Sequence, residues 1–380
     1  MSAIEDEGRA QQTLPTVKIF LCGDVMTGRG IDQVLPLPCA PQLHEQYMTL
    51  ATDYVSLAEQ AHGAIAKPVD PAYIWGVSLE EMQRQEPAAR IINLEMSITR
   101  CEDFSPKGIN YRTSPENAVC LTAADIDCCV LANNHVLDFG RAGLIDTLSA
   151  LERLNIRTAG AGRDLNEATA PAVIDIGKGS RLIILACVAL SSGVPLAWAA
   201  RRNKPGVNLC HLSDLDAEAI ADQVARVRRL GDIVVVSIHW GSNWGYDVPD
   251  DHTRFARRLI DIAGVSVVHG HSSHHPRAIE IYRNRLILYG CGDFLNDYEG
   301  IRGYERFRSD LSLMYFATID RRSGNLSGLE MVPLQIRRFQ LIRASREDCK
   351  WLGDTLDRES RRFGAQVEMT AGGALTCRPV

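Results

Sequence analysis

Recurrent apolar runs, rich in Val, Ile, Leu and Cys, restrict the fold of this 380-residue chain more than any other feature. Most of the runs are continuous instead of alternating, which is typical of strands covered on both faces. Segments with apolar residues at helical spacing lie between several of them. This pattern predicts a layered α/β architecture. The predicted strands cover residues 17–22, 91–94, 128–131, 182–187, 233–238, 265–268, 286–288 and 313–319.

Helices are predicted where apolar residues recur at intervals of three and four. Ser213 precedes one of these segments and is a suitable N-cap. Pro249 opens another, and Gly264 ends it. The last segment is rich in Arg and is expected to add nothing to the sheet. The predicted helices cover residues 141–154, 214–229, 250–263 and 346–362.

We predict a single main domain with an insertion, not two domains. The domain covers residues 17–345, and its insertion, about 35–86, is longer than a simple βα connection requires. This insertion is expected to add helices beside the sheet, as a lid or as one wall of a cleft. Residues 1–16 are expected to form a disordered tail. Residues 346–380 are expected to form a C-terminal helix and a tail that is mobile beyond Gly364.

Composition excludes several classes of protein and of partner. Hydrophobic residues make up 46% of the chain, which excludes a disordered chain or a collagen-like fibre. Lys and Arg total 41 against 47 Asp and Glu, a net charge of −6, so sequence-independent nucleic-acid binding is not expected.

Cysteine usage and the N-terminus predict a compartment. The 11 cysteines are irregularly spaced and fall largely in apolar runs, where a thiol packs as a small hydrophobe and no disulfide framework is indicated. The N-terminus is acidic, and no run reaches the roughly 18 apolar residues of a membrane anchor. We therefore expect a cytoplasmic protein with reduced thiols.

Polar side chains follow the predicted strands at the points where the strands end. Asp24, Glu95, His239 and Asp293 each stand at such an end, and Asn133-Asn134-His135 follows a fifth strand. Ligands of open α/β sheets bind outside these ends. Six of the ten histidines lie between residues 239 and 275, and His252 among them falls in a predicted helix. Carboxylates, Asn and His are ligands of Mn, Fe, Zn or Mg, so one shared site of metal type is predicted.

Several short motifs resemble the CapA family, the capsule and poly-γ-glutamate synthesis proteins related to calcineurin-like metallophosphatases. The resemblance runs from about residue 17 to residue 297 and implies a four-layer α/β/β/α sandwich of the metallophosphatase type. The motifs are Gly23-Asp24-Val25-Met26, Asn93-Leu94-Glu95, Asn133-Asn134-His135, Gly160-Ala161-Gly162, His239-Trp240-Gly241, Gly270-His271-Ser272-Ser273-His274 and Gly290-Cys291-Gly292-Asp293-Phe294.

The resemblance also implies a set of site residues. His135 is similar to the proton donor or phosphate contact beside the metal. The chain departs from the metallophosphatase pattern in three ways: Met26 stands where a His is usual, Glu95 stands where a bridging Asp is usual, and the final Gly-His-x-His is spaced differently. A divalent metal (Mn, Fe, Zn or Mg) is therefore expected to be bound weakly or not at all. The metal ligands implied are Asp24, Glu95, Asn134, His239, His271 and His274.

The first hypothesis for function is metal-assisted hydrolysis of a phosphoester or a related anionic substrate. Bound metal would lower the pKa of a water to about 7, and His135 would meet charge on the leaving oxygen. Arg29 is expected to meet the anionic substrate. The further substrate contacts predicted are Asn133, Trp240, Trp244 and Asp293.

Two other hypotheses keep the same residues with different roles. A metal-independent epimerase of the lasso-peptide type would invert a peptide Cα with Asp24 on one face and His271 or His274 on the other. A non-catalytic factor in capsule or poly-γ-glutamate assembly would use the pocket for binding only. Polyglutamate or a peptide is thus the expected macromolecular substrate.

Overall fold

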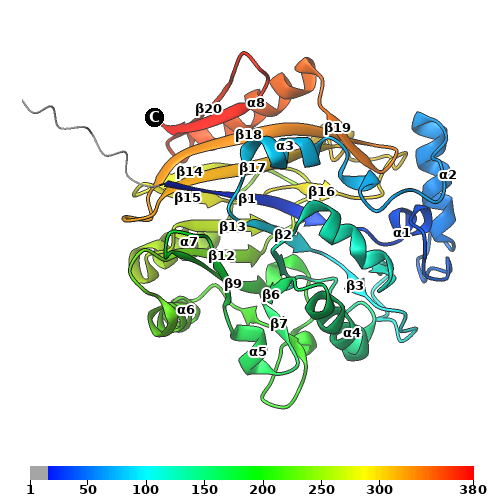
Figure 1. Ribbon diagram of the computed structural model, residues 1–380, viewed down its shortest axis with the longest axis horizontal. Helices are drawn as coiled ribbons and strands as arrows, with labels where there is room; N and C mark the ends of the chain where they lie inside the picture. Colours follow the sequence, from blue (N-terminus) through cyan, green and yellow to red (C-terminus); the bar gives the residue numbers. More distant parts are fainter. Residues whose placement is uncertain (1–15) are drawn as a thin grey trace, which may run out of the picture.

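Two β-sheets lie at the centre of the structure, with helices around them (Figure 1). The structure is a computed structural model that describes residues 16–380. The tail predicted at residues 1–16 lies outside the described residues, except for Thr16, which begins β1 (Thr16–Val25). Both sheets contain parallel and antiparallel pairs, so the predicted α/β class is confirmed.

The larger sheet has ten strands and holds β1 near its middle. Its main order is β20-β21-β18-β17-β1-β2-β5-β6, while β16 pairs with β1 and β19 with β18. β1 runs parallel to β2 and β16 and antiparallel to β17. The other strands of this sheet are β2 (Arg90–Leu94), β5 (Cys128–Val130), β6 (Arg157–Ala159), β16 (Asp293–Leu295), β17 (Leu311–Asp320), β18 (Leu326–Arg337), β19 (Gln340–Arg343), β20 (Ala365–Met369) and β21 (Leu375–Pro379).

The smaller sheet has seven strands, in the order β11-β9-β12-β13-β15-β14 with β8 paired to β9. Two short ribbons accompany the sheets, β3 (Ser97–Ile98) with β4 (Arg112–Thr113) and β7 (Ala161–Gly162) with β10 (Gly206–Val207). Each of the eight predicted strands overlaps a strand of the two sheets. The strands of the smaller sheet are β8 (Ala172–Asp175), β9 (Arg181–Ala189), β11 (Leu209–Cys210), β12 (Ile233–His239), β13 (Val267–His271), β14 (Ile279–Tyr282) and β15 (Arg285–Leu288).

The smaller sheet is apolar on both faces because its strands alternate between two cores. Val235 points into the large core that also takes residues of the ten-stranded sheet. Val234 and Val236 point the other way and pack with Val224 and Phe255 of two covering helices. These helices are α6 (Asp214–Val227), capped by Ser213 as predicted, and α7 (Asp250–Ala263). The other helices are α1 (Gly30–Val34), α2 (Ala51–His62), α3 (Ser78–Gln85), α4 (Gly140–Arg153), α5 (Leu165–Thr169) and α8 (Arg346–Arg361).

The C-terminal segment corrects one expectation. Residues beyond Gly364 are not a mobile tail but the hairpin β20–β21, which pairs with β18 and adds two strands to the sheet. Val367, Leu375 and Cys377 are buried in the core, whereas their sequence neighbours are more exposed. This alternation is the signal of a half-buried hairpin, and it is too short to stand out beside the longer apolar runs.

The predicted insertion and the cysteines are also placed. Residues 35–86 contain α2 and α3 as expected, and Trp75 between them is fully buried with its Nε1 donating to the carbonyl of Cys120 at 2.7 Å. All 11 cysteines lie in the described part of the chain and are free; Cys101 alone is not fully buried. Between residues 16 and 380, no helix combines the length and the apolar character needed to cross a membrane.

Candidate metal centre

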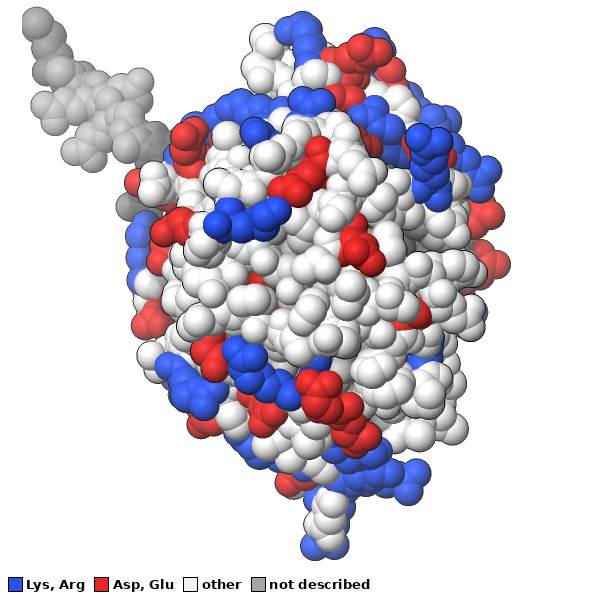
Figure 2. All heavy atoms as spheres, turned by 90° about the vertical axis from the view of Figure 1, so that its right-hand side faces the viewer, with Lys and Arg blue, Asp and Glu red and all other residues white. Residues whose placement is uncertain are grey.

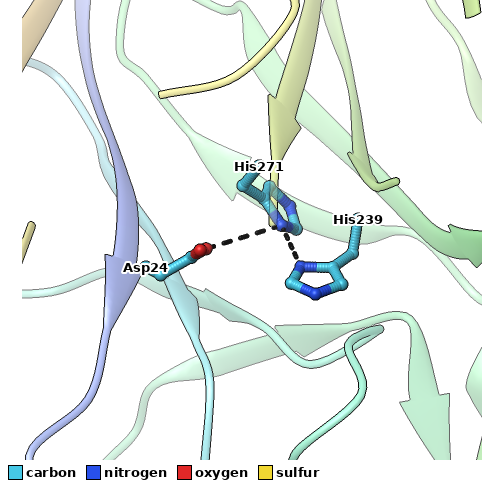
Figure 3. A group of neighbouring side chains, drawn as sticks. All are labelled: Asp24, His239 and His271. Atoms are coloured by element: carbon cyan, nitrogen blue, oxygen red, sulfur yellow. Dashed lines mark hydrogen bonds and ion pairs between the residues drawn. The ribbon is translucent and has the colours of Figure 1, made fainter. Parts of the chain in front are cut away.

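The predicted site residues meet where the carboxyl ends of β1, β12 and β13 converge (Figure 3). Asp24 is in register with Asn93 of β2 on one side and with Asp293 of β16 on the other. His239 and His271 are register partners on β12 and β13. His269 Nε2 lies 2.7 Å from the carbonyl oxygen of Cys22, which links the two sheets directly beside Asp24. The site is therefore built between the sheets, where both are rigid.

Asp24, His239 and His271 form the first of two groups that could hold a metal ion. The Nδ1 atoms of the two histidines lie 2.8 Å apart, and His271 Nδ1 is 3.8 Å from Asp24 Oδ1 (Figure 3). All three side chains are buried. Burial lowers the pKa of both imidazoles well below the usual value, so they are neutral, the form in which histidine binds metals.

Neighbouring groups orient the two rings. Asn134 Oδ1, which accepts hydrogen bonds only, lies 3.2 Å from His239 Nε2, while the Asn134 amide donates to Ser192 O. His239 therefore carries its proton on Nε2 and presents a lone pair at Nδ1. Ser237 Oγ lies 2.8 Å from His271 Nε2, so a polar contact at Nε2 fixes the orientation of this ring too, with Nδ1 toward Asp24. This is the arrangement found around metal-binding histidines. Asn134, predicted as a ligand, belongs to neither group and orients His239.

Asp24, His274 and Asp293 form the second group. His274 Nδ1 lies 2.9 Å from Asp293 Oδ1, and Asn296 donates to Asp293 Oδ2 at 2.8 Å. Asn243 Nδ2 lies 3.0 Å from His274 Nε2. Asp24 is common to both groups, so its carboxylate joins them into one centre.

The backbone around Asp24 is also specialised. Asn93 Nδ2 donates to Asp24 Oδ1 at 2.7 Å, and the Ser272 amide lies 3.3 Å from Oδ2. Ser272 has φ = 105°, a conformation that side-chain-bearing residues rarely adopt. Strain of this kind concentrates at functional sites, where the surrounding structure enforces it.

Acidic side chains are concentrated at the centre. Burial and the nearby Asp293 raise the pKa of Asp24 from 3.8 to about 7. Burial and the charge of Asp24 raise the pKa of Glu95 well above its usual value. Glu95 Oε2 is buried without a hydrogen-bond partner among the described residues. Three adjacent buried carboxylates and an unpartnered oxygen fit a divalent cation, which would neutralise them, and the mixture of Asp and His suits Mn, Fe or Zn.

His135 lies beside the centre and is held from behind. Its Nδ1 is 2.6 Å from Asp138 Oδ2, and Lys107 Nζ is 2.8 Å from Asp138 Oδ1. His135 Nε2 faces inward, 3.9 Å from Glu95 Oε1. Burial lowers the pKa of His135 to about 4, so its resting state is the neutral ring. Asp138 therefore selects the tautomer that leaves a lone pair on Nε2.

Of the residues predicted to contact substrate, Asp293 and Trp244 lie at the centre, whereas Asn133 supports a neighbouring loop. Asp293 is part of the second group, and Trp244 lies beside His274, with 5.2 Å between their ring centroids. Asn133 is buried, and its side chain bonds Asn93, the Leu94 carbonyl and the amides of residues 135 and 136. It therefore shapes the loop that carries His135.

The prediction that Trp240 walls the pocket is wrong. Trp240 follows His239 at the end of β12, so it points to the opposite face of the sheet. There it is buried against α7, stacked on His252 with ring centroids 4.4 Å apart, and it donates to the carbonyl of Tyr289 at 3.0 Å. His252, as expected, belongs to neither metal-type group.

Arg29, predicted to meet an anionic substrate, is buried and already paired. Its guanidinium donates to both carboxylate oxygens of Asp297, to Glu45 at 3.0 Å and to the Tyr54 hydroxyl at 3.0 Å. Glu45 and Tyr54 lie in the predicted insertion, while Asp297 follows β16. Arg29 therefore ties the insertion to the centre and offers no free charge to a ligand.

Several residues of the site were missed by the sequence reasoning. Asp138 carries a local signal, because it stands three residues after His135. Lys107 and Tyr111 lie on a loop without any motif and are brought in only by folding. Tyr298, by contrast, stands in the polar run that follows a predicted strand, and its hydroxyl lies 2.8 Å from that of Tyr111.

The face over the carboxyl ends of these strands is shown in Figure 2. Charged side chains gather toward its upper and lower ends, and its central area carries few of them. The acidic side chains of the centre, Asp24, Glu95 and Asp293, are buried. Their separation from solvent would strengthen their interaction with a bound cation.

Comparisons with known proteins agree with this geometry. A "Probable polyglutamine synthesis accessory protein" of Mycobacterium tuberculosis (strain H37Rv) is 50% identical over 355 residues, 92% of this chain and 93% of that protein. The "PGA biosynthesis protein CapA" of Bacillus subtilis (strain 168) is 28% identical over 246 residues, 64% of this chain and 60% of its own length. The "Capsule biosynthesis protein CapA" of Bacillus anthracis is 24% identical over 231 residues, 61% and 53% of the two chains.

The family match covers the whole centre. A sequence model for the family described as "Bacterial capsule synthesis protein PGA_cap" matches residues 18–298, a span that contains both metal-type groups and His135. The chain therefore belongs to the PGA_cap family of bacterial capsule synthesis proteins.

Proposed function

We propose that this protein is a metal-dependent hydrolase that acts on a phosphoester or a related anionic substrate during synthesis of a glutamate polymer. The observation that carries the proposal is the pair of buried metal-type groups that share Asp24. We further propose that the two sheets and their helices form the four-layer sandwich of the metallophosphatases. The packing of α6 and α7 on the outer face of the smaller sheet supports this.

The chain's own residues have distinct roles in this proposal. Divalent ions (Mn, Fe, Zn or Mg) would be held by Asp24 with His239 and His271, and by Asp24 with His274 and Asp293. When bound, such ions polarise a substrate oxygen and lower the pKa of water toward about 7. Glu95 supplies a buried carboxylate oxygen that has no hydrogen-bond partner among the described residues.

His135 is proposed to move a proton at Nε2. Asp138 accepts the Nδ1 proton and Lys107 pairs with Asp138, so the ring is fixed with Nε2 toward the centre. A histidine held in this way takes up or gives a proton efficiently, because no ring rotation is required at the moment of transfer.

The biological context is proposed from the relatives. The mycobacterial relative is named for polyglutamine synthesis and the bacillary relatives for PGA or capsule biosynthesis. An accessory enzyme of glutamate-polymer synthesis is therefore the role that we assign. The free cysteines support a reducing compartment, and we propose the cytoplasm.

The epimerase hypothesis is less well supported. Inversion of a Cα requires acid and base on opposite faces of the carbon. His271 Nδ1 lies only 3.8 Å from Asp24 Oδ1, and a ring nitrogen of His274 lies within 4.8 Å of an Asp24 oxygen, so neither histidine leaves room for a carbon atom between acid and base. Deuterium incorporation at a peptide Cα in heavy water would nevertheless favour the epimerase over the hydrolase.

Metal analysis and turnover test the proposal together. We expect purified protein incubated with Mn and then dialysed to retain about one to two metal ions per chain and to hydrolyse p-nitrophenyl phosphate. His239→Ala is expected to reduce metal affinity and turnover by at least about 100-fold, because it removes a donor atom. His252→Gln, which alters an equally buried histidine outside both groups, is the matched control. Absence of both metal and turnover in the wild type would overturn the hydrolase, and absence of deuterium exchange as well would leave the assembly factor.

Asp138→Asn is expected to lower turnover by about 100-fold or more without changing metal content, because the amide no longer selects the productive tautomer of His135. The pH dependence of turnover should shift as well. Asp146→Asn on α4 is the control, since that exposed carboxylate bonds Thr99 and not His135. Unchanged turnover in Asp138→Asn would remove His135 from proton transfer.

A further inference from the structure

Two tyrosines form a wall of the centre that neither the motifs nor the metal-type groups include. The Tyr111 ring meets His135 edge-on, with 4.5 Å between the ring centroids. The Tyr298 ring meets His274 edge-on at 5.5 Å. The two hydroxyl oxygens lie 2.8 Å apart. The hydroxyl pair therefore spans the gap between the proposed proton-transfer residue and a proposed metal ligand.

The wall is held rigidly from behind by Arg29. The guanidinium carbon lies 4.4 Å from the Tyr111 ring centroid and 5.8 Å from that of Tyr298. Its N–H groups are bonded to Asp297, Glu45 and Tyr54, so the cation does not turn toward the centre. Asp297 directly precedes Tyr298 in the chain. The position of the tyrosine pair is therefore determined by a buried ionic network.

One hydroxyl hydrogen of the pair lacks a strong acceptor. Tyr111 and Tyr298 share one hydrogen bond, and the other hydrogen bond of the pair among the described residues is Tyr298 donating to Met26 Sδ at 3.7 Å. A thioether is a weak acceptor, so the second hydroxyl hydrogen is poorly satisfied within the protein. Tyr111 is buried and Tyr298 is half-buried. The Tyr298 hydroxyl therefore stands at the edge of the protein interior, where a ligand oxygen would be a stronger acceptor than the thioether.

The cations near the centre are already paired. Arg29 is bonded to two carboxylates, and Lys107 is bonded to Asp138. An anionic group that reaches the centre must therefore be met by neutral donors in addition to any bound metal.

We propose that Tyr298, paired with Tyr111, forms an oxyanion subsite in which the Tyr298 hydroxyl donates to a non-bridging oxygen of a phosphoryl group. The inference rests on the proposed hydrolase function and assigns a substrate contact to it. Donors of this kind, aimed at an oxygen that gains charge, contribute strongly to catalysis in a buried site.

Titration calorimetry of inorganic phosphate binding to the Mn-loaded protein tests the subsite without relying on turnover. Tyr298→Phe removes only the hydroxyl and is expected to raise the phosphate dissociation constant about tenfold. Turnover of p-nitrophenyl phosphate should fall about 100-fold. Mn content should stay at the wild-type value, and the melting temperature should fall no further than in Tyr289→Phe, which also removes one bonded hydroxyl. Tyr289→Phe is the matched control, because that buried hydroxyl bonds Glu280 in the outer core.

The outcomes separate the subsite from the proposed function. Equal phosphate affinity in Tyr298→Phe and in the Mn-loaded wild type overturns the subsite, as does a wild type that holds Mn but binds no phosphate. Phosphate binding that depends on Tyr298, in a wild type that hydrolyses nothing, supports the subsite and overturns the hydrolase. A wild type that holds no Mn and binds no phosphate overturns both.

Discussion

Asp24→Asn is expected to abolish metal binding and to reduce turnover by about 1,000-fold or more. The reason is geometric, because Asp24 belongs to both metal-type groups, so one substitution removes a charged donor from each. Metal content after incubation with Mn and dialysis, together with hydrolysis of p-nitrophenyl phosphate, measures the effect. Asp146→Asn on α4 serves as a control for the change from Asp to Asn.

Although Asp24→Asn should abolish metal binding and turnover, it should raise the stability of the metal-free protein at pH 8. In the metal-free protein, burial and Asp293 raise the pKa of Asp24 from 3.8 to about 7, so the folded state binds this proton more tightly than the unfolded state does. The metal-free wild type should therefore lose stability as the pH rises from about 4 to above 7. Asp24→Asn should unfold at a higher urea concentration at pH 8 and show a weaker pH dependence.

A metal-free wild type that is no less stable at pH 8 than at pH 5 would contradict this account of Asp24. So would an Asp24→Asn variant that still holds two metal ions, because a centre joined by one carboxylate cannot lose that carboxylate and stay intact.

Gly23→Ala is expected to destabilise the fold by about 4 kcal/mol or more, or to prevent soluble expression. A Cβ atom on Gly23 would lie 1.6 Å from the carbonyl oxygen of Gly292. That oxygen also accepts a hydrogen bond from the amide of Asp24 at 3.0 Å, so the backbone cannot move aside without displacing Asp24. Urea denaturation and metal content should both show the loss.

Gly328→Ala is the control for this prediction. Gly328 lies in β18, and a Cβ atom there would meet nothing within 4 Å. It should be neutral or stabilising by about 0.5 kcal/mol, since Ala loses less conformational entropy than Gly on folding. If Gly23→Ala had the same stability and metal content as the wild type, that result would contradict the close approach of Gly23 in β1 to Gly292, which directly precedes β16.

The centre could be predicted largely because strand ends bring distant residues together in a regular way. Asp24, His239 and His271 each end a continuous apolar run, and such runs mark strands covered on both faces. Their ends meet at one edge of the layers, so the residue type at the end of the run is enough to indicate a shared site. Four of the seven strands of the smaller sheet, β9, β12, β13 and β15, could be predicted for the same reason.

The contacts that could not be predicted depend on the tertiary fold. Arg29 is satisfied by Asp297, which lies 268 positions later in the chain, so no local pattern distinguishes it from a free anion-binding arginine. Lys107 reaches Asp138 from a loop without periodicity. Trp240 differs from these, because the alternation of side chains after His239 already places it on the opposite face.

The central position of β1 has a consequence for the order of events during synthesis. β1 is translated first, yet two of its three partners are β16 and β17, whose residues lie between 293 and 320. The apolar strand β1 therefore stays incompletely paired until β16 and β17 have been synthesised. Such long-range pairing slows folding and leaves apolar surface exposed to aggregation. Asp293 arrives with β16, so the second metal-type group is complete only after that strand has been made.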